Sequence, residues 1–169
     1  KSRQKSLRIL HVTNFNERLD GRLFFNTGRR INNGLIRLGH SVLGFSDRDI
    51  QKYYKSFKDF KGSKMLNDKL KKTCYNYKPD IIITGHADLI TEQQIQELKD
   101  DYPNTKFAQW FLDPLNKKGP DYERNKKRIL DKIQVMDSTF MTTSPSALSF
   151  LPKKNNNYRS EEHTSELQS

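Results

Sequence analysis

The chain has 169 residues, 33% of them hydrophobic, and a mean hydropathy of −0.92, which together allow one domain with one core. Its net charge of +11 favours phosphates, nucleic acid or anionic headgroups as partners, although abundant Lys and Asn also follow from an AT-rich genome. The single cysteine, Cys74, excludes an internal disulfide and argues against a Cys-based zinc site. No apolar run approaches the roughly 20 residues of a membrane span, and the start "KSRQKS" lacks a signal-peptide core, so we expect a cytoplasmic location.

Short apolar runs alternate with amphipathic stretches along the chain. The runs predict five buried strands, at 7–14, 41–46, 80–84, 106–112 and 138–143. The amphipathic stretches predict four helices, at 23–38, 63–77, 91–102 and 122–133. Gly39 stands where a left-handed helix C-cap is expected, and Thr91 with Gln94 predicts a capping box. We expect 47–62 to be a loop with helical turns, and Cys74 to be a small buried hydrophobe.

This alternation predicts an α/β fold, a Rossmann-like doubly wound parallel sheet of about five strands. Parallel neighbours joined by helices require right-handed crossover connections, which place the helices on the faces of the sheet. In such sheets the ligand binds beyond the carboxyl ends of the strands, at the topological switch point. The residues that follow each strand are therefore the candidates for a functional site.

The loop after the first strand is polar but lacks a dinucleotide fingerprint. A G-x-G-x-x-G motif would have to follow the strand at once, whereas Gly21 comes seven residues late. Hydrogen bonds to sugar hydroxyls or phosphate are available from four side chains of this loop, those of Asn14, Asn16, Asp20 and Arg22. The alternative is an ordinary solvated loop in which Asp20 caps the following helix.

The later strand ends supply a histidine and carboxylates. "DRD" follows the second strand, and its Arg48 is expected to form a salt bridge that holds the loop. "GHAD" follows the third strand, where Gly85 permits a tight turn and His86 can donate to a sugar hydroxyl or transfer a proton, or be structural. Asp113 follows the fourth strand, where it can orient a hydroxyl nucleophile or cap a turn. No metal-ligand spacing, G-x-S-x-G or P-loop is present.

Several segments resemble a known family when they are taken in order. "GLIRLGHSVLGFS" is similar to the L-x-x-x-G-H-x-V helix-to-strand junction of GT-B glycosyltransferase N-terminal domains, and "KPDIIITGHADL" to their P-D-h-h-h-x-H strand end. Together with "QWFLDPL" and "MDSTFMTTSP", the series most resembles the CgeB-like glycosyltransferases, a bacterial group named for a spore-maturation protein. The resemblance covers about Arg8 to Leu151.

The resemblance implies a two-domain enzyme of cell-surface glycan biosynthesis. The first Rossmann-like domain receives a glycan, lipid-linked or protein acceptor, and a second domain, which this chain lacks, binds the nucleotide-sugar donor. The reaction takes place between the two domains and needs no metal and no other cofactor. By position, His86 matches the family's cleft histidine and Gly21 its glycine-containing first loop, although that loop departs from the paired glycines of many relatives.

The ends of the chain are expected to lie outside this domain. We expect 1–6 to be disordered, 7–152 to form the domain, and 153–158 to be a truncated linker. The closing "RSEEHTSELQS", residues 159–169, resembles the translation of a sequencing-adapter oligonucleotide, so we expect it to be non-native.

Two other functional classes are compatible with these patterns. A non-enzymatic flavodoxin-like module of the receiver type would need an acidic residue at the end of the third strand, which here ends in Thr84 and Gly85. A basic nucleic-acid-binding domain would show salt-dependent affinity, but the aromatic residues form no stacking platform on neighbouring strands, so we expect no nucleic-acid partner. The basic charge also allows peripheral contact with the inner face of a membrane.

Overall fold

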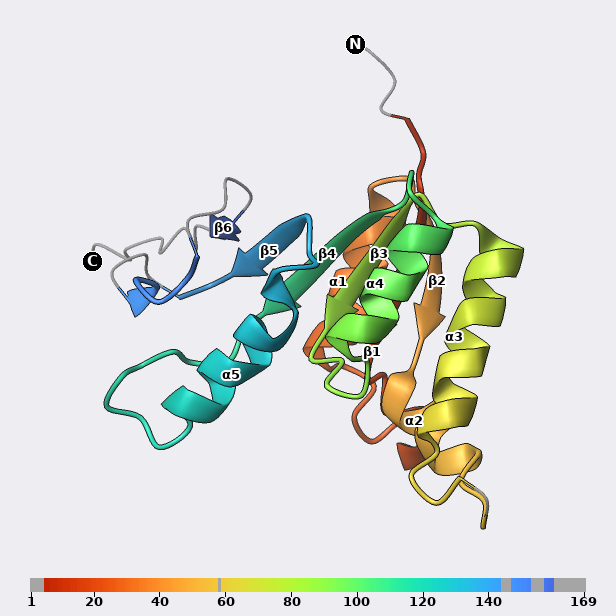
Figure 1. The fold of residues 1–169 in the computed structure, drawn as a ribbon, viewed down its shortest axis with the longest axis horizontal. Helices are drawn as coiled ribbons and strands as arrows, with labels where there is room; N and C mark the ends of the chain where they lie inside the picture. Colours follow the sequence, from red (N-terminus) through yellow and green to blue (C-terminus); the bar gives the residue numbers. More distant parts are fainter. Residues whose placement is uncertain (1–4, 58, 144–146, 153–156, 160–169) are drawn as a thin grey trace, which may run out of the picture.

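The computed structural model describes residues 5–57, 59–143, 147–152 and 157–159, the last of these as backbone only. Within them, all strand pairs are parallel, and the sheet has the order β2-β1-β3-β4-β5-β6 (Figure 1). The six strands are β1 (Arg8–Thr13), β2 (Ser41–Phe45), β3 (Ile81–Gly85), β4 (Lys106–Phe111), β5 (Ser138–Met141) and β6 (Asn157–Arg159). The predicted doubly wound α/β fold is confirmed.

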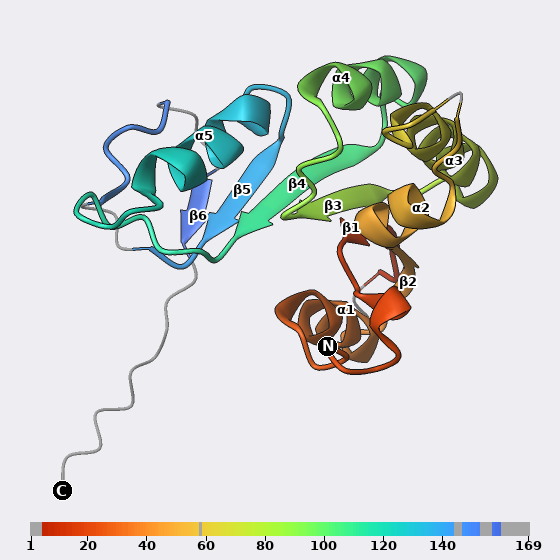
Figure 2. The ribbon, with the colours of Figure 1, turned by 90° about the horizontal axis from the view of Figure 1, so that it is seen from below.

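The helices cover both faces of this sheet. They are α1 (Thr27–Arg37), α2 (Asp47–Tyr53), α3 (Ser63–Tyr77), α4 (Glu92–Asp101) and α5 (Tyr122–Ile133), and a short 3₁₀ turn, η1 (Glu17–Leu19), precedes α1. Figure 2 shows α1 on one face of the sheet and α3, α4 and α5 on the other. The chain therefore reverses its direction of winding after β2, and the switch point lies between β1 and β3.

The main core lies between the sheet and the helices α3 and α4. Leu66, Leu70 and Cys74 follow one another at four-residue spacing along α3, and all three are buried. They pack in one cluster with Leu10 and Ile82 of the central strands. Burial raises the pKa of the Cys74 thiol to about 12, so this cysteine is an inert part of the core, as the sequence predicts.

Helix ends agree with the sequence where local signals are strong. Helices α3 and α5 have the predicted bounds, and Thr91 and Gln94 form the predicted capping box at the start of α4. The prediction of a helix from residue 23 is wrong, because the Asn26 side chain accepts from the Arg29 backbone N–H and starts α1 at Thr27. The segment expected to be a loop with helical turns, 47–62, contains a regular helix, α2.

The carboxyl-terminal part differs from the expectation in one respect. Strand β6 pairs with β5 and occupies Asn157–Arg159, where the sequence predicts the end of a linker and the start of a non-native tail. The expected disorder of 1–4 and the expectations for 153–156 and 160–169 lie outside the described residues. Among the described residues, no helix combines the length and the apolar character needed to cross a bilayer.

Candidate functional site

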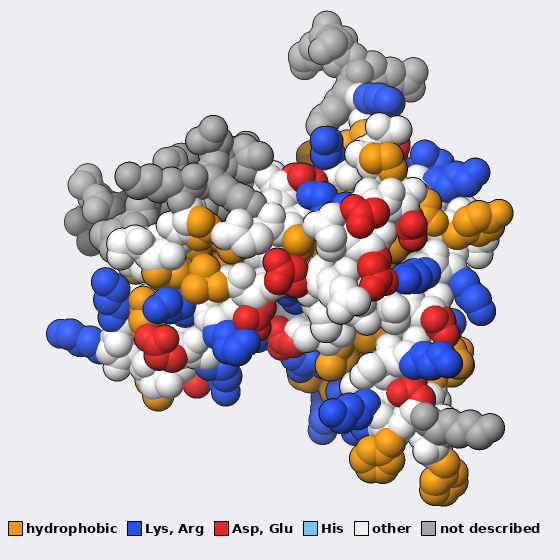
Figure 3. All heavy atoms as spheres, in the orientation of Figure 1, with side chains coloured by type: hydrophobic (Ala, Val, Ile, Leu, Met, Phe, Trp, Pro, Cys, Tyr) orange, Lys and Arg blue, Asp and Glu red, His pale blue; other side chains and the backbone are white. Residues whose placement is uncertain are grey.

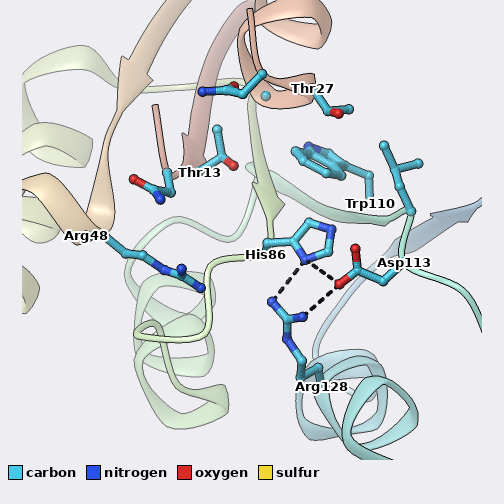
Figure 4. Close-up of a pocket in the computed structure, with 11 residues that line it drawn as sticks. Thr13, Thr27, Arg48, His86, Trp110, Asp113 and Arg128 are labelled. Atoms are coloured by element: carbon cyan, nitrogen blue, oxygen red, sulfur yellow. Dashed lines mark hydrogen bonds and ion pairs between the residues drawn. The ribbon is translucent and has the colours of Figure 1, made fainter. Parts of the chain in front are cut away.

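A pocket of about 410 Å³ opens at the carboxyl ends of the strands, the size of a small-ligand site. It lies at the switch point of the sheet, where residues of β1, β4, α1, α2 and α5 meet residues of the loops after β1, β3 and β4 (Figure 4). The pocket is lined by Thr13, Asn14, Asn26, Thr27, Gly28, Arg48, His86, Trp110, Leu112, Asp113 and Arg128.

One wall is a cluster of His86, Asp113 and Arg128. Arg128, on α5, donates from Nη1 to Asp113 Oδ2 over 3.0 Å, and its Nη2 lies 3.0 Å from His86 Nδ1. Arg128 also forms a bidentate pair with Asp88, with donor–acceptor distances of 2.9 and 2.8 Å. The guanidinium group therefore joins the loop after β3 to the loop after β4 (Figure 4).

This geometry fixes the protonation of His86. A guanidinium group has no acceptor, so the contact with Arg128 requires Nδ1 of His86 to accept and leaves the ring proton on Nε2. The pKa of His86 is lowered from its ordinary value, chiefly because burial disfavours the imidazolium. Asp113 opposes that shift and Arg128 adds to it. His86 is thus a neutral hydrogen-bond donor through Nε2 at pH 7.

Burial alone would lower the pKa of Arg128, but Asp88 and Asp113 outweigh it and raise that pKa. The guanidinium group is therefore a fixed positive charge between two carboxylates.

Gly85 does not have the role in the turn that the sequence suggests. The tight turn after β3 is made by His86 itself, which has a φ of 49°, and Gly85 is not among the residues of positive φ. Gly85 is required for a different reason: a Cβ atom there would lie 1.8 Å from Trp110 Cε2. The His86 ring stacks on Phe111 with 4.9 Å between centroids and meets Trp110 edge-on at 5.2 Å.

Trp110 is held by a buried histidine. Its indole crosses Gly85 of β3 and donates from Nε1 to Nε2 of His11 on β1 over 3.1 Å. Nδ1 of His11 lies 3.3 Å from Oδ1 of Asn32 on α1. Burial lowers the pKa of His11 to about 4, so the ring is neutral and accepts from Trp110 at neutral pH. Trp110 is the only tryptophan of the chain, and its fluorescence reports directly on this pocket.

The opposite wall is the N-terminus of α1. Asn26, Thr27 and Gly28 line the pocket, and the first backbone N–H groups of a helix have no partner within it. A Cβ atom on Gly28 would lie 2.7 Å from Thr13 Cγ2, so glycine lets the helix start approach the end of β1. An oxyanion such as a phosphate is the ligand that such a helix end favours.

Two buried charges lie behind the cluster. Lys132 of α5 is buried and donates to the Ala87 carbonyl over 2.7 Å, and burial lowers its pKa. Asp47 of α2 is buried, and neither of its side-chain oxygens has a hydrogen-bond partner. Burial raises the pKa of Asp47 from 3.8 to about 6.

The replacement Asp47→Asn is expected to remove a pH-dependent cost of folding. The native pKa of Asp47 is raised, so the folded state favours the protonated carboxyl group. The stability that this group contributes is fully present below pH 3.8 and is lost as the pH rises through about 6. The loss amounts to roughly 3 kcal/mol, at about 1.4 kcal/mol per pKa unit. Urea unfolding of both proteins between pH 4 and about pH 8 measures this. The free energy of unfolding of the variant, relative to that of the wild type, should increase up to about pH 6 and be constant above it. A difference that stays constant with pH would contradict the assignment.

The structure brings together three of the residues that the sequence selects. Asn14, His86 and Asp113 line the pocket, and Gly85 lies directly beside it, accepting a bond from the Thr13 hydroxyl over 2.6 Å. Four others lie outside the lining, namely Asn16, Asp20, Gly21 and Arg22. The reason is that η1 turns the loop aside, and the Asn16 side chain accepts from the Asn14 amide over 2.8 Å.

Arg48 forms the salt bridge that the sequence predicts, with Asp88 of the loop after β3 over 3.1 Å, and it also lines the pocket. Asp49 holds the first loop, by accepting from the Glu17 backbone N–H and from Arg18, both over 2.8 Å. No sequence signal marks Arg128, because it lies within a helix, far along the chain from the strand ends it joins.

A scan against protein-family models finds no match, and a search among curated proteins finds no significant match either. Among the described residues, no group of three or more His, Cys, Asp or Glu side chains is arranged to hold a metal ion.

Proposed function

We propose that this chain is the acceptor-side, N-terminal Rossmann-like domain of a GT-B glycosyltransferase of the CgeB-like type. The longer enzyme moves a sugar from a nucleotide sugar to a glycan, lipid-linked or protein acceptor. The observation that carries the proposal is one pocket in which the N-terminus of α1 faces the cluster of His86, Asp113 and Arg128. The motif resemblance supports the same assignment.

Each wall suits one need of sugar transfer. A transferred sugar leaves a nucleoside diphosphate, and the first N–H groups of α1 can add to the second domain's stabilisation of its developing negative charge. An acceptor hydroxyl needs a group that accepts its proton or orients it, and Asp113 is placed for this, with Oδ2 held by Arg128. His86 donates from Nε2 to a second oxygen of the sugar or acceptor. The contacts to the nucleotide base belong to the second domain.

The replacement His86→Ala is expected to lower the turnover of the longer enzyme about 10- to 100-fold. One well-placed donor to an oxygen in the site contributes roughly 1 to 3 kcal/mol. The measurement is release of nucleoside diphosphate from a panel of nucleotide sugars. His40→Ala is the matched control, because His40 lies at the amino end of β2 and accepts from the Leu7 backbone N–H. Equal rates in both variants, or nucleotide-sugar turnover by the present chain alone, would overturn the proposal.

The strand order also fits a flavodoxin-like module, which we retain as the second candidate. A receiver-type module needs a carboxylate at the end of β3 to accept phosphate. Strand β3 ends in Thr84 and Gly85, and the pocket carboxylate nearest to it, Asp113, follows β4 and is paired with Arg128. Incubation with acetyl phosphate should therefore leave the mass of the chain unchanged, and a stable phosphoryl adduct would favour the receiver.

A further inference from the structure

The segment between α2 and α3 exposes apolar side chains where a folded chain usually buries them. We call residues 52–65 the aromatic–lysine segment. Phe57 is fully exposed, at 105%, and Phe60 is 82% exposed. Tyr53, Tyr54 and Met65 are exposed beside them. Figure 3 shows hydrophobic side chains protruding at the lower end of this face, next to Lys and Arg.

The same segment is strongly basic. Lys52, Lys55, Lys61 and Lys64 alternate with the aromatic residues and are exposed, and the sequence adds Lys58. The Lys69 ammonium group of α3 lies 4.9 Å from the centre of the Tyr54 ring. A surface with both positive charge and exposed aromatic rings is complementary to a partner that is anionic outside and apolar beneath.

The backbone of the segment is folded so that its one acidic residue, Asp59, faces the start of α3. The Asp59 carboxylate accepts from the backbone N–H groups of Ser63 and Met65, over 3.1 and 3.0 Å, and so caps α3. The Gln51 side chain donates to the Lys61 carbonyl over 2.7 Å. Gly62, with a φ of 67°, packs so closely on Gln51 that a Cβ atom would lie 2.7 Å from its carbonyl oxygen. The turn is thus fixed by polar contacts, while Phe57 and Phe60 point outward on either side of Asp59.

We propose that the aromatic–lysine segment docks this chain onto bilayers that contain anionic lipids. The lysines approach the headgroups, and Phe57 and Phe60 enter the interfacial region, where aromatic rings are favoured. The side chain of phenylalanine has no polar group. Two such rings at the tip of a turn therefore fit the apolar part of a bilayer better than they fit the bases of a nucleic acid. Docking of this kind is peripheral, because only side chains of one exposed segment enter the bilayer surface.

The aromatic–lysine segment lies near the pocket, so docking would bring the pocket close to the membrane. Arg48, in the first turn of α2, lines the pocket, and the aromatic–lysine segment begins near the end of that helix. Figure 1 shows α2 and the following turn beyond the carboxyl ends of the strands, and the residues that line the pocket lie at these strand ends too. A membrane bound by this segment therefore lies near the mouth of the pocket.

Sedimentation with vesicles tests the proposal. The chain should pellet with vesicles of phosphatidylcholine containing about one-third phosphatidylglycerol, and at least about tenfold less with phosphatidylcholine alone. A Phe57→Trp variant should show a blue shift of its added indole emission on the anionic vesicles, because Trp110 is buried already. The assay needs no transferase activity, so its failure leaves the proposed function open.

Matched variants distinguish docking by this segment from non-specific electrostatic or hydrophobic binding to the vesicles. The double variants Phe57→Ser/Phe60→Ser and Lys55→Glu/Lys61→Glu should each weaken vesicle binding by about tenfold or more. Tyr75→Ser and Lys106→Glu are the controls, since both residues are exposed and lie at the other end of α3 and of the sheet. Equal binding by all variants would overturn the proposal. So would binding of a single-stranded oligonucleotide, or self-association, that depends on Phe57 and Phe60 while vesicles are not bound.

Discussion

The replacement Gly85→Ala is expected to lower the free energy of unfolding by roughly 3 to 5 kcal/mol, and to change the pocket with it. Gly85 lies opposite Thr13 of β1 and Trp110 of β4 in the register of the sheet. The Trp110 ring crosses this position to reach His11, so a Cβ atom would lie within 1.8 Å of it. Because β3 has a hydrogen-bonded neighbour on each side, the backbone cannot move away. The ring must leave His11, which loses a buried hydrogen bond as well.

Urea unfolding followed by circular dichroism measures this effect. Gly34→Ala is the control, because a Cβ atom on Gly34 meets nothing within 4 Å, and Ala in a helix interior is neutral or stabilising by up to about 1 kcal/mol. A second change, Trp110→Leu, should cost clearly less in the Gly85→Ala background than in the wild type, because it removes the collision. Strict additivity of the two changes would show that the collision is not the cause.

The sequence predicted the parts of the fold that are set by local pattern. The four-residue spacing of Leu66, Leu70 and Cys74 determines the buried face of α3, and the Thr91–Gln94 capping box starts α4. The helix α1 was predicted within 23–38, but its buried face could not be, because its buried residues are Gly28 and Asn32 rather than an apolar stripe. Asn32 is buried because it contacts His11, and that contact exists only in the folded chain.

The site was predictable in part for the same reason. Parallel strands end at one edge, so His86 and Asp113 could be expected to meet, and their Nδ1 and Oδ2 atoms lie 3.5 Å apart. The fold of the loop 14–26 depends on tertiary contacts such as that of Arg18 with Asp49, so the sequence could not show that Gly21 lies outside the pocket. Nor could it identify Arg128.

The structure gives a reason for the glycine, Gly85, that precedes His86. The usual expectation is a turn that only glycine can make, yet His86 itself adopts the left-handed conformation. The glycine instead leaves room for an indole that links β4 to β1 beneath the pocket. Substitution at this position therefore affects packing first and the orientation of His86 second.

The replacement Arg128→Met is expected to have the largest effect on the candidate site. It leaves Asp88 and Asp113 without their shared partner, and should cost about 2 to 3 kcal/mol of stability, since both carboxylates remain partly exposed. In the longer enzyme of the proposed function, we expect turnover to fall at least about 100-fold, because His86 and Asp113 lose their common support. Arg124→Met is the control, since Arg124 lies one turn earlier on α5 and its ion pair with Asp121 is exposed.

The pH dependence of the Arg128→Met variant distinguishes a site role from a packing role. Arg128 lowers the pKa of His86 while Asp113 and Asp88 raise it, so removing the arginine should raise that pKa. Burial lowers the pKa of His86 in both proteins, so protonation of the ring at low pH costs folding stability, and this cost is smaller in the variant than in the wild type. The variant should therefore lose less stability near pH 5 than near pH 8, and NMR titration of the His86 ring should follow the shift. An unchanged His86 titration would show that Arg128 does not control the protonation of the histidine.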